Sequence, residues 1–269
     1  MTIRFVVRPE GFKRTPSKLA QALQARQTLL YAPGTPYFNR RAPLDADKDL
    51  FLCAPDVGLL PPNQRTEDRA LTNRFFRATK GGQRKLLQEW GVKTPESYPA
   101  CPSREDATNR TAYVVRPLRH FGGQEYRVTN SPTDFNPALE YISPLFPKEH
   151  EYRVIYLKGQ PVITLYKRLP ETEVNFDGPW GHDTASTFVT VNNPENNRGR
   201  NYPKFYEDFG RTPLVRGSHL LGVDVMIARN HKYAVCEVNF CPSVTIDGNL
   251  TKIATLLSGL NGQTTTRNV

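Results

Sequence analysis

The chain has 269 residues, 38% of them hydrophobic and 23% charged, a balance typical of a globular protein with a sizeable core. It contains no apolar run long enough to cross a bilayer, and the opening segment MTIRFVVRPEGFKR is too charged for a signal peptide. The four cysteines show no CxxC spacing, which argues against a zinc site and a disulfide framework. We therefore expect a reduced, cytoplasmic protein.

The formal charge of +10 comes from 36 lysines and arginines against 26 aspartates and glutamates. A surplus of this size favours polyanionic partners: nucleotide phosphates, nucleic acid or acidic peptides. The basic residues are spread along the chain and form no basic tail. This distribution indicates a charged cleft more than a dedicated nucleic-acid-binding arm.

The beginning of the chain is predicted to form a small α/β lobe. Residues 2–8 (TIRFVVR) read as a strand, and residues 15–27 as a helix with Thr15 as its N-cap and Pro16 in its first turn. A strand followed by a helix is typical of the start of such a lobe. The proline-rich segment after it predicts fixed loops around a short strand, LFLCAP.

A second helix is predicted from about Gly81 to Trp90, ending at Gly91. Lys80 stands at its N-terminal end, where the helix dipole favours an anion; a solvated surface lysine is the equal alternative. Two strands follow within residues 112–128, joined by a tip that contains Gly-Gly. Such a tip is able to offer backbone N–H groups to phosphates, although most such turns have no ligand.

Residues 138–170 are predicted to contain a strand, LEYI, and then a hairpin, EYRVIYL and QPVITLYKR, turned at Lys158-Gly159. Arg153 points from one of these strands, and a cation on a central sheet is costly unless it is paired or bound to an anion. We expect Arg153 to face a ligand. The polar stretch 171–213 is predicted to be a functional loop, a lid or a connector, with a strand at STFVTV.

The segment 222–243 is predicted to form a second hairpin, and an amphipathic helix follows over 250–260. Glu237 and Asn239 are two residues apart, so both side chains leave the same face of their strand. Asp224 on the partner strand is expected to lie opposite them. Two carboxylates and an amide oxygen suit Mg²⁺. The alternative is a hairpin whose polar residues face water.

In this order, the elements resemble the ATP-grasp superfamily, most closely its branch of glutamate ligases that modify ribosomal protein tails. The resemblance runs from about residue 70 to residue 253. The motifs that carry it are, in chain order, Lys80 with GVKTP, VVRP with HFGGQ, LEYI, EYRV, and Asp224 followed by Glu-x-Asn-x-x-Pro at Glu237, Asn239 and Pro242. The last motif and the order of all of them are the specific part of the resemblance.

The resemblance implies an α/β (α+β) fold of the ATP-grasp type, with two α+β lobes that grip ATP after a small N-terminal α/β lobe. The corresponding boundaries are 1–75 for the N-terminal lobe, 76–145 for the small lobe with its glycine-rich loop, and 146–269 for the large lobe with the metal site. The insertion at 171–213 lies within the large lobe and does not align with the substrate segment of the relatives. The substrate is therefore left open.

Several residues are implied to bind the nucleotide. Those expected to contact or cover the ATP phosphates are Lys80, Arg116, Gly122 and Gly123. Those expected to form the hinge beside adenine and to hold the ribose are Glu140, Tyr141, Ile142 and Glu151. The family usually has lysine where this chain has Arg116, and arginine keeps the charge but grips phosphate with a different geometry.

The remaining implied residues serve the metal and the reaction. Asp224, Glu237 and Asn239 are expected to coordinate two Mg²⁺ ions, for which Mn²⁺ substitutes. Arg153, Lys167 and Arg168 are expected near the γ-phosphate.

The implied activity is an ATP-dependent carboxylate–amine ligase that passes through an acyl phosphate, with an acidic peptide, a protein or an amino acid as acceptor. The alternative is a nucleotide- or nucleic-acid-binding module of the same fold without ligase activity.

Overall fold

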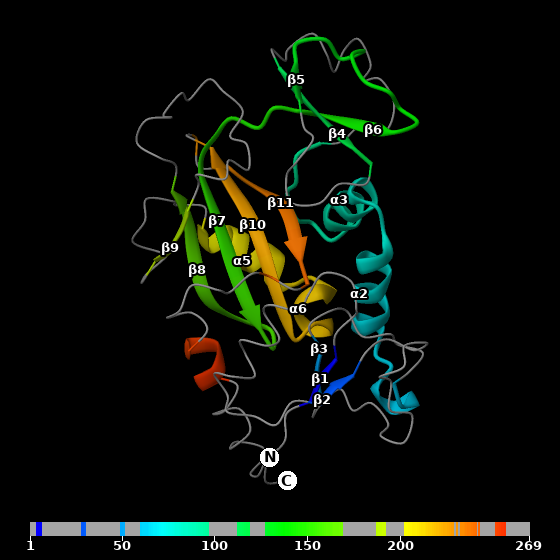
Figure 1. Cartoon of the computed structure of the whole chain (residues 1–269), viewed down its shortest axis with the longest axis vertical. Helices are drawn as coiled ribbons and strands as arrows, with labels where there is room; N and C mark the ends of the chain where they lie inside the picture. Colours follow the sequence, from blue (N-terminus) through cyan, green and yellow to red (C-terminus); the bar gives the residue numbers. More distant parts are fainter. Residues whose placement is uncertain are drawn as a thin grey trace.

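The computed structural model describes most of the chain from residue 60 onward and three short strands before it (Figure 1). The described residues are 4–6, 28–30, 49–51, 60–96, 112–118, 127–168, 187–191, 202–228, 230, 232–240, 242 and 251–256. They form three sheets, with strand orders β2-β1-β3, β11-β10-β7-β8-β9 and β5-β4-β6. Mixed α/β structure is therefore confirmed.

The N-terminal sheet consists of β1 (Arg4–Val6), β2 (Thr28–Leu30) and β3 (Asp49–Phe51). Both neighbours of β1 run parallel to it. Parallel strands need a crossover connection, as expected for an α/β lobe. The strands expected at TIRFVVR and LFLCAP are confirmed, whereas the helix expected over 15–27 lies outside the described residues.

Two helices follow a short 3₁₀ turn, η2 (Pro62–Gln64). They are α2 (Glu67–Arg77) and α3 (Lys80–Glu89). Each begins at a threonine whose hydroxyl accepts a backbone N–H from the first turn, Thr66 from Arg69 and Thr79 from Gly82. The start of α3 matches the expected helix within one residue, but α2 was not anticipated.

The small sheet contains β4 (Tyr113–Pro117), β5 (Arg127–Thr129) and β6 (Glu140–Pro144). β4 pairs antiparallel with both of the others, which confirms the expected pair of strands and the strand at LEYI. Tyr113, Val115 and Ile142 are fully buried and form a small core of their own with Phe135. Gly122 and Gly123 lie outside the described residues.

The large sheet contains five antiparallel strands: β7 (Lys148–Leu157), β8 (Gln160–Arg168), β9 (Thr187–Val191), β10 (Leu220–Ala228) and β11 (Tyr233–Asn239). The expected turn between β7 and β8 is confirmed: Lys158 and Gly159 have φ values of 44° and 84°. Positive φ at both positions matches the twist of a two-residue hairpin turn. The hairpin β10–β11 and the strand at STFVTV are confirmed as well.

One face of the large sheet carries the main core, and the helices α5 (Tyr202–Gly210) and α6 (Pro213–Gly217) contribute to it. Phe205 and Phe209 lie one helical turn apart on α5 and are fully buried there. The expectation of a loop, lid or connector over 171–213 is therefore wrong for its C-terminal part. Two phenylalanines at helical spacing outweigh the polar composition around them.

α2 and α3 pack on the same core as the large sheet, through Phe75, Leu86 and Leu87. Figure 1 shows both helices beside β11, below the small sheet. α3 thus shares its core with the large sheet. The expected small lobe of residues 76–145, which contains α3 and β4–β6, remains a prediction. Residues 251–256 are helical, in agreement with the expected final helix. Among the described helices, none is both long and apolar enough to cross a membrane.

Candidate functional site

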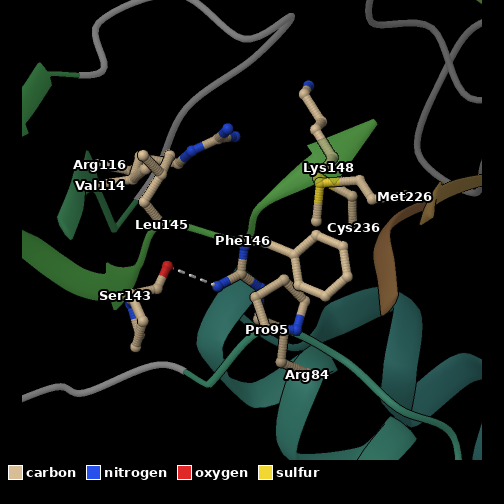
Figure 2. A pocket seen from close by; sticks show the side chains of 11 residues that line it. Arg84, Pro95, Val114, Arg116, Ser143, Leu145, Phe146, Lys148, Met226 and Cys236 are labelled. Atoms are coloured by element: carbon tan, nitrogen blue, oxygen red, sulfur yellow. Dashed lines mark hydrogen bonds between the residues drawn. The ribbon is translucent and has the colours of Figure 1, made fainter. Parts of the chain in front are cut away.

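A cavity open to solvent lies where the small sheet, α3 and the large sheet meet (Figure 2). Its walls combine cationic, apolar and sulfur-bearing side chains: Arg84, Pro95, Val114, Arg116, Ser143, Pro144, Leu145, Phe146, Lys148, Met226 and Cys236. A second cavity is lined by Lys80, Tyr141 and Glu237 and shares Arg84, Arg116 and Cys236 with the first. The two cavities therefore adjoin, and together they form the candidate site.

The strand register explains why charged side chains gather on this face of the large sheet. Asp224 on β10 lies opposite Glu237 on β11 and opposite Arg153 on β7. Residues directly opposite one another project from the same face of a sheet. The expectation that Asp224 lies across the hairpin from Glu237 is therefore confirmed. Asn239 lies opposite Gly222, two positions further along the same face.

Two β-bulges, each an extra residue in one strand, bring further side chains to this charged face of the large sheet. Regular alternation would place these side chains on the opposite face. On β11, Glu237 pairs with Asp224 but Val235 pairs with Val225, so Cys236 is an extra residue between them. A bulge of this kind re-aims a side chain. The Cys236 side chain accordingly lines both cavities.

The second bulge lies at the start of β7. His150 pairs with Ile227, whereas Ala228 pairs with Lys148, which leaves Glu149 as the extra residue. Lys148 therefore projects from the same face as Glu151, although three residues separate them, and its Nζ lies 2.6 Å from the Glu151 carboxylate.

Both expected metal-binding carboxylates are engaged in ion pairs. The Lys80 Nζ lies 2.5 Å from Glu237 Oε1, and each of these side chains is about a quarter exposed. Arg153 grips Asp224 with two hydrogen bonds, of 2.6 Å from Nε and 2.8 Å from Nη2, and this pair is buried. Burial raises the pKa of Asp224, and the Arg153 guanidinium opposes that rise.

Glu151 is the centre of a third charged group. Besides Lys148, the buried Lys167 lies 3.4 Å from its carboxylate. Burial alone would raise the pKa of Glu151, but the two lysines outweigh burial and hold it below its ordinary value. Glu151 was expected to hold the ribose and Lys167 to act near the γ-phosphate. In the structure these two side chains contact each other. Arg168 ends β8, and its side chain lies outside the described part of the structure.

Arg116, at the end of β4, directs its guanidinium into the site (Figure 2). Burial opposes its charge, but Cys236, Tyr141 and Glu237 nearby outweigh that effect and raise the pKa of Arg116. Burial also raises the pKa of the Cys236 thiol. The surroundings of Arg116 therefore favour the charged form of its guanidinium and the neutral form of the Cys236 thiol.

The expected hinge residues divide between the site and the small sheet. Tyr141 lines the second cavity, but Ile142 lies in the small core. The Glu140 carboxylate is bound by the exposed Arg127 guanidinium and by the backbone N–H of Asn136, on the outside of the small sheet. The cavity wall is formed instead by the residues that follow, Ser143 to Phe146.

Besides the wall from Ser143 to Phe146, sequence reasoning missed Arg84, Met226, Lys148 and Cys236. Arg84 lies one helical turn after Lys80, and Met226 lies two residues after Asp224, so helix and strand spacing could have found both. Lys148 and Cys236 owe their positions to the bulges, for which the sequence offers no clear signal.

The donor set fits Mg²⁺, the ion that was expected at this site. Asp224 and Glu237 supply carboxylates from adjacent strands, and Asn239 supplies an amide oxygen on the same face. Oxygen ligands of this kind suit Mg²⁺, which leaves its other positions to water and phosphates. Within the described residues, no group of three or more histidines, cysteines, aspartates and glutamates gathers as a metal site.

No family model matches the chain, and neither does any curated protein. Solved structures do. The ATP-grasp ligase PsnB, complexed with a variant precursor, Mg and ADP, is 13% identical with a TM-score of 0.61, and the alignment covers 97% of this chain and 99% of PsnB.

Two further structures match over nearly the same length. The macrocyclase MdnC from Microcystis aeruginosa MRC, bound with the precursor peptide MdnA, is 14% identical with a TM-score of 0.52, covering 96% of this chain and 99% of MdnC. A RimK domain ATP-grasp protein from Sphaerobacter thermophilus DSM 20745 is 13% identical with a TM-score of 0.57, covering 97% and 99%. Together with the two sheets and the site between them, these similarities show that the chain has the ATP-grasp fold.

Proposed function

We propose that the protein is an ATP-dependent carboxylate–amine ligase. The observation that carries this proposal is the cavity that Lys80, Arg116 and Glu237 line, with Asp224 directly opposite Glu237 on the neighbouring strand. Cations at a cavity, with a pair of carboxylates at its wall and beside it, suit a nucleotide triphosphate bound with Mg²⁺. The ATP-grasp fold supports the same reading, because it is the fold of the ligases that the chain resembles in structure.

In this proposal the protein positions and neutralises charge and supplies no covalent nucleophile. A carboxylate oxygen of the substrate attacks the γ-phosphorus of ATP, which forms an acyl phosphate and releases ADP. An amine then attacks the acyl carbon and displaces inorganic phosphate, losing a proton as the amide forms. Both steps build negative charge on phosphate oxygens, which nearby cations stabilise.

The residues of the site divide between these tasks. Lys80 and Arg116 bind the phosphates, with Gly122 and Gly123 proposed to close over them. Tyr141 and the residues after it lie beside the base, and Glu151 holds the ribose. Those proposed to act near the transferred phosphate are Arg153, Lys167 and Arg168.

Asp224, Glu237 and Asn239 would hold two Mg²⁺ ions, or Mn²⁺ in their place. When bound, the metal supplies charge neutralisation to the phosphate oxygens. Because Asp224 and Glu237 are already paired with Arg153 and Lys80, binding requires these two carboxylates to exchange partners. The chain's own cations are then free to face the phosphates.

We propose a peptide or protein with acidic residues as the carboxylate substrate. PsnB and MdnC are described in complex with precursor peptides, PsnA2 and MdnA respectively. The charge of +10 suits an acidic partner of this kind.

The test is ADP release from ATP and Mg²⁺ across a panel of amino acids, acidic peptides and DNA. Stimulated release that is lost in Asp224→Asn/Glu237→Gln and kept in Glu89→Gln would support the ligase; Glu89 is an exposed residue of α3. ATP binding without release for any member of the panel would favour the alternative, a nucleotide- or nucleic-acid-binding module. Mass spectrometry of the peptide product then identifies the new amide.

A further inference from the structure

We infer that Arg84 is a positioning residue of the nucleotide site, which fixes the wall after β6 relative to α3. This inference rests on the proposed function, because the role assigned is in nucleotide binding. Arg84 is only 6% exposed and lines both cavities. It lies one helical turn after Lys80, on the same face of α3.

Two contacts hold the Arg84 guanidinium against β6. Its Nη1 donates a hydrogen bond of 3.2 Å to the hydroxyl of Ser143, as Figure 2 shows. Its central carbon lies 5.2 Å from the centroid of the Tyr141 ring, within the range of a cation–π contact. A planar guanidinium is able to stack on a ring and donate a directed hydrogen bond together, which a lysine ammonium on its flexible stem does less well.

These contacts join two separately packed parts of the protein. α3 belongs to the main core through Leu86 and Leu87, whereas β6 belongs to the small sheet, with Ile142 in its core. Arg84 spans the boundary between them and lines both cavities. A side chain in this place sets how far the small sheet stands from α3.

The wall that Arg84 holds is the apolar one. After Ser143, the chain continues through Leu145 and Phe146, which line the first cavity together with Pro95. An apolar wall of this kind suits the flat face of a nucleobase, whereas the phosphates suit the cations at Lys80 and Arg116. Loss of Arg84 is therefore expected to weaken binding of the base and to leave binding of the phosphates intact.

Calorimetric titration with ADP and with inorganic tripolyphosphate, in excess Mg²⁺, tests this separation. In Arg84→Lys the Kd for ADP should rise about tenfold, the size of one lost hydrogen bond to a charged group, while the Kd for tripolyphosphate stays unchanged. Ser143→Ala should shift the ADP Kd in the same direction by less. Lys85→Gln, on the exposed side of α3, is the matched control and should leave both values unchanged.

An unchanged Kd for ADP in Arg84→Lys would overturn the inference. An equal loss for ADP and tripolyphosphate would overturn it too, because Arg84 would then act on the phosphates directly. If circular dichroism shows that Arg84→Lys is unfolded, Ser143→Ala decides by the same two criteria, since it removes one hydroxyl and keeps the arginine. A wild-type protein that binds neither ligand would instead overturn the proposed function, and the inference with it.

Discussion

Lys80 and Glu237, 157 residues apart in the chain, form an ion pair of 2.5 Å between the first turn of α3 and β11. Both side chains line the second cavity, as do Arg84 and Arg116. Both side chains remain about a quarter exposed, so solvent screens the attraction between them. The pair therefore adds little to stability and leaves Lys80 able to turn to a ligand.

Replacement of this lysine should affect binding far more than folding. Lys80→Gln is expected to raise the Kd for ADP with Mg²⁺ by about tenfold or more, because a charge-assisted phosphate contact is lost. The free energy of unfolding should change by no more than about 1 kcal/mol, as for other partly exposed pairs. Titration calorimetry and urea unfolding, with Lys85→Gln as control, measure the two effects. A large loss of stability with unchanged ADP binding would contradict this assignment.

The pair of Arg153 and Asp224 should behave in the opposite way, because it is buried. Removal of one partner leaves the other charged and buried, so Arg153→Met and Asp224→Val are each expected to cost about 3–5 kcal/mol. The double variant removes both charges and should be markedly less destabilised than the sum of the two single variants. Urea unfolding of the four proteins completes the cycle; simple additivity would show that the two side chains are not coupled.

Much of this arrangement follows from local patterns that a sequence shows. The turn at Lys158-Gly159 and the alternation along β10 and β11 predict the hairpins, and the hairpin in turn predicts that Asp224 meets Glu237. The start of α3 at Lys80 follows from helix signals alone. These features depend on spacing and turn chemistry within about twenty residues, which is the range over which such rules hold.

What could not be predicted depends on irregularity or on contacts across the chain. The bulges at Glu149 and Cys236 reverse the side on which Lys148 and Cys236 project, and strict alternation gives the wrong face for both. α5 is helical because Phe205 and Phe209 reach a core built by distant strands. The contact of the Glu140 carboxylate with Arg127, on the outside of the small sheet, also had no local signal, and the expected place of Glu140 in the hinge remains a prediction.

Glu151 provides a pH-dependent contribution to stability whose sign follows from its lysine partners. The pKa of Glu151 in the folded protein is lowered from the ordinary value of 4.5. The contribution of Glu151 to stability is therefore fully present above pH 4.5, and it is lost as the pH falls through the pKa of the folded state. The difference in unfolding free energy between wild type and Glu151→Gln should therefore be largest at neutral pH and shrink in acid.

Urea unfolding of both proteins between neutral pH and the acid range measures this difference. Lys148→Met, which removes the nearer lysine, should make the contribution of Glu151 less dependent on pH, because it takes away part of the attraction that lowers the pKa. A difference between wild type and Glu151→Gln that stays constant as the pH falls would contradict the prediction.

Gly217, on α6, lets that helix approach α2 closely. A Cβ at this position would lie 2.2 Å from the Thr72 hydroxyl oxygen and 2.6 Å from the Asp68 backbone oxygen. Thr72 donates a hydrogen bond to the backbone of Pro213 across the same contact, so it is not free to move away. Gly217→Ala is therefore expected to destabilise the protein by about 1–3 kcal/mol, as overpacking of a close contact does.

The control is Gly210→Ala, at the end of α5, where an added Cβ meets nothing within 4 Å. Alanine is the better helix former, so this variant should be neutral or slightly more stable than wild type. Thermal unfolding of the two variants compares the same chemical change at a crowded and an open position. Equal melting temperatures for both would mean that α2 and α6 separate without cost. In that case the close approach of α6 would contribute nothing to holding α2, and with it the start of α3 at Lys80, against the large sheet.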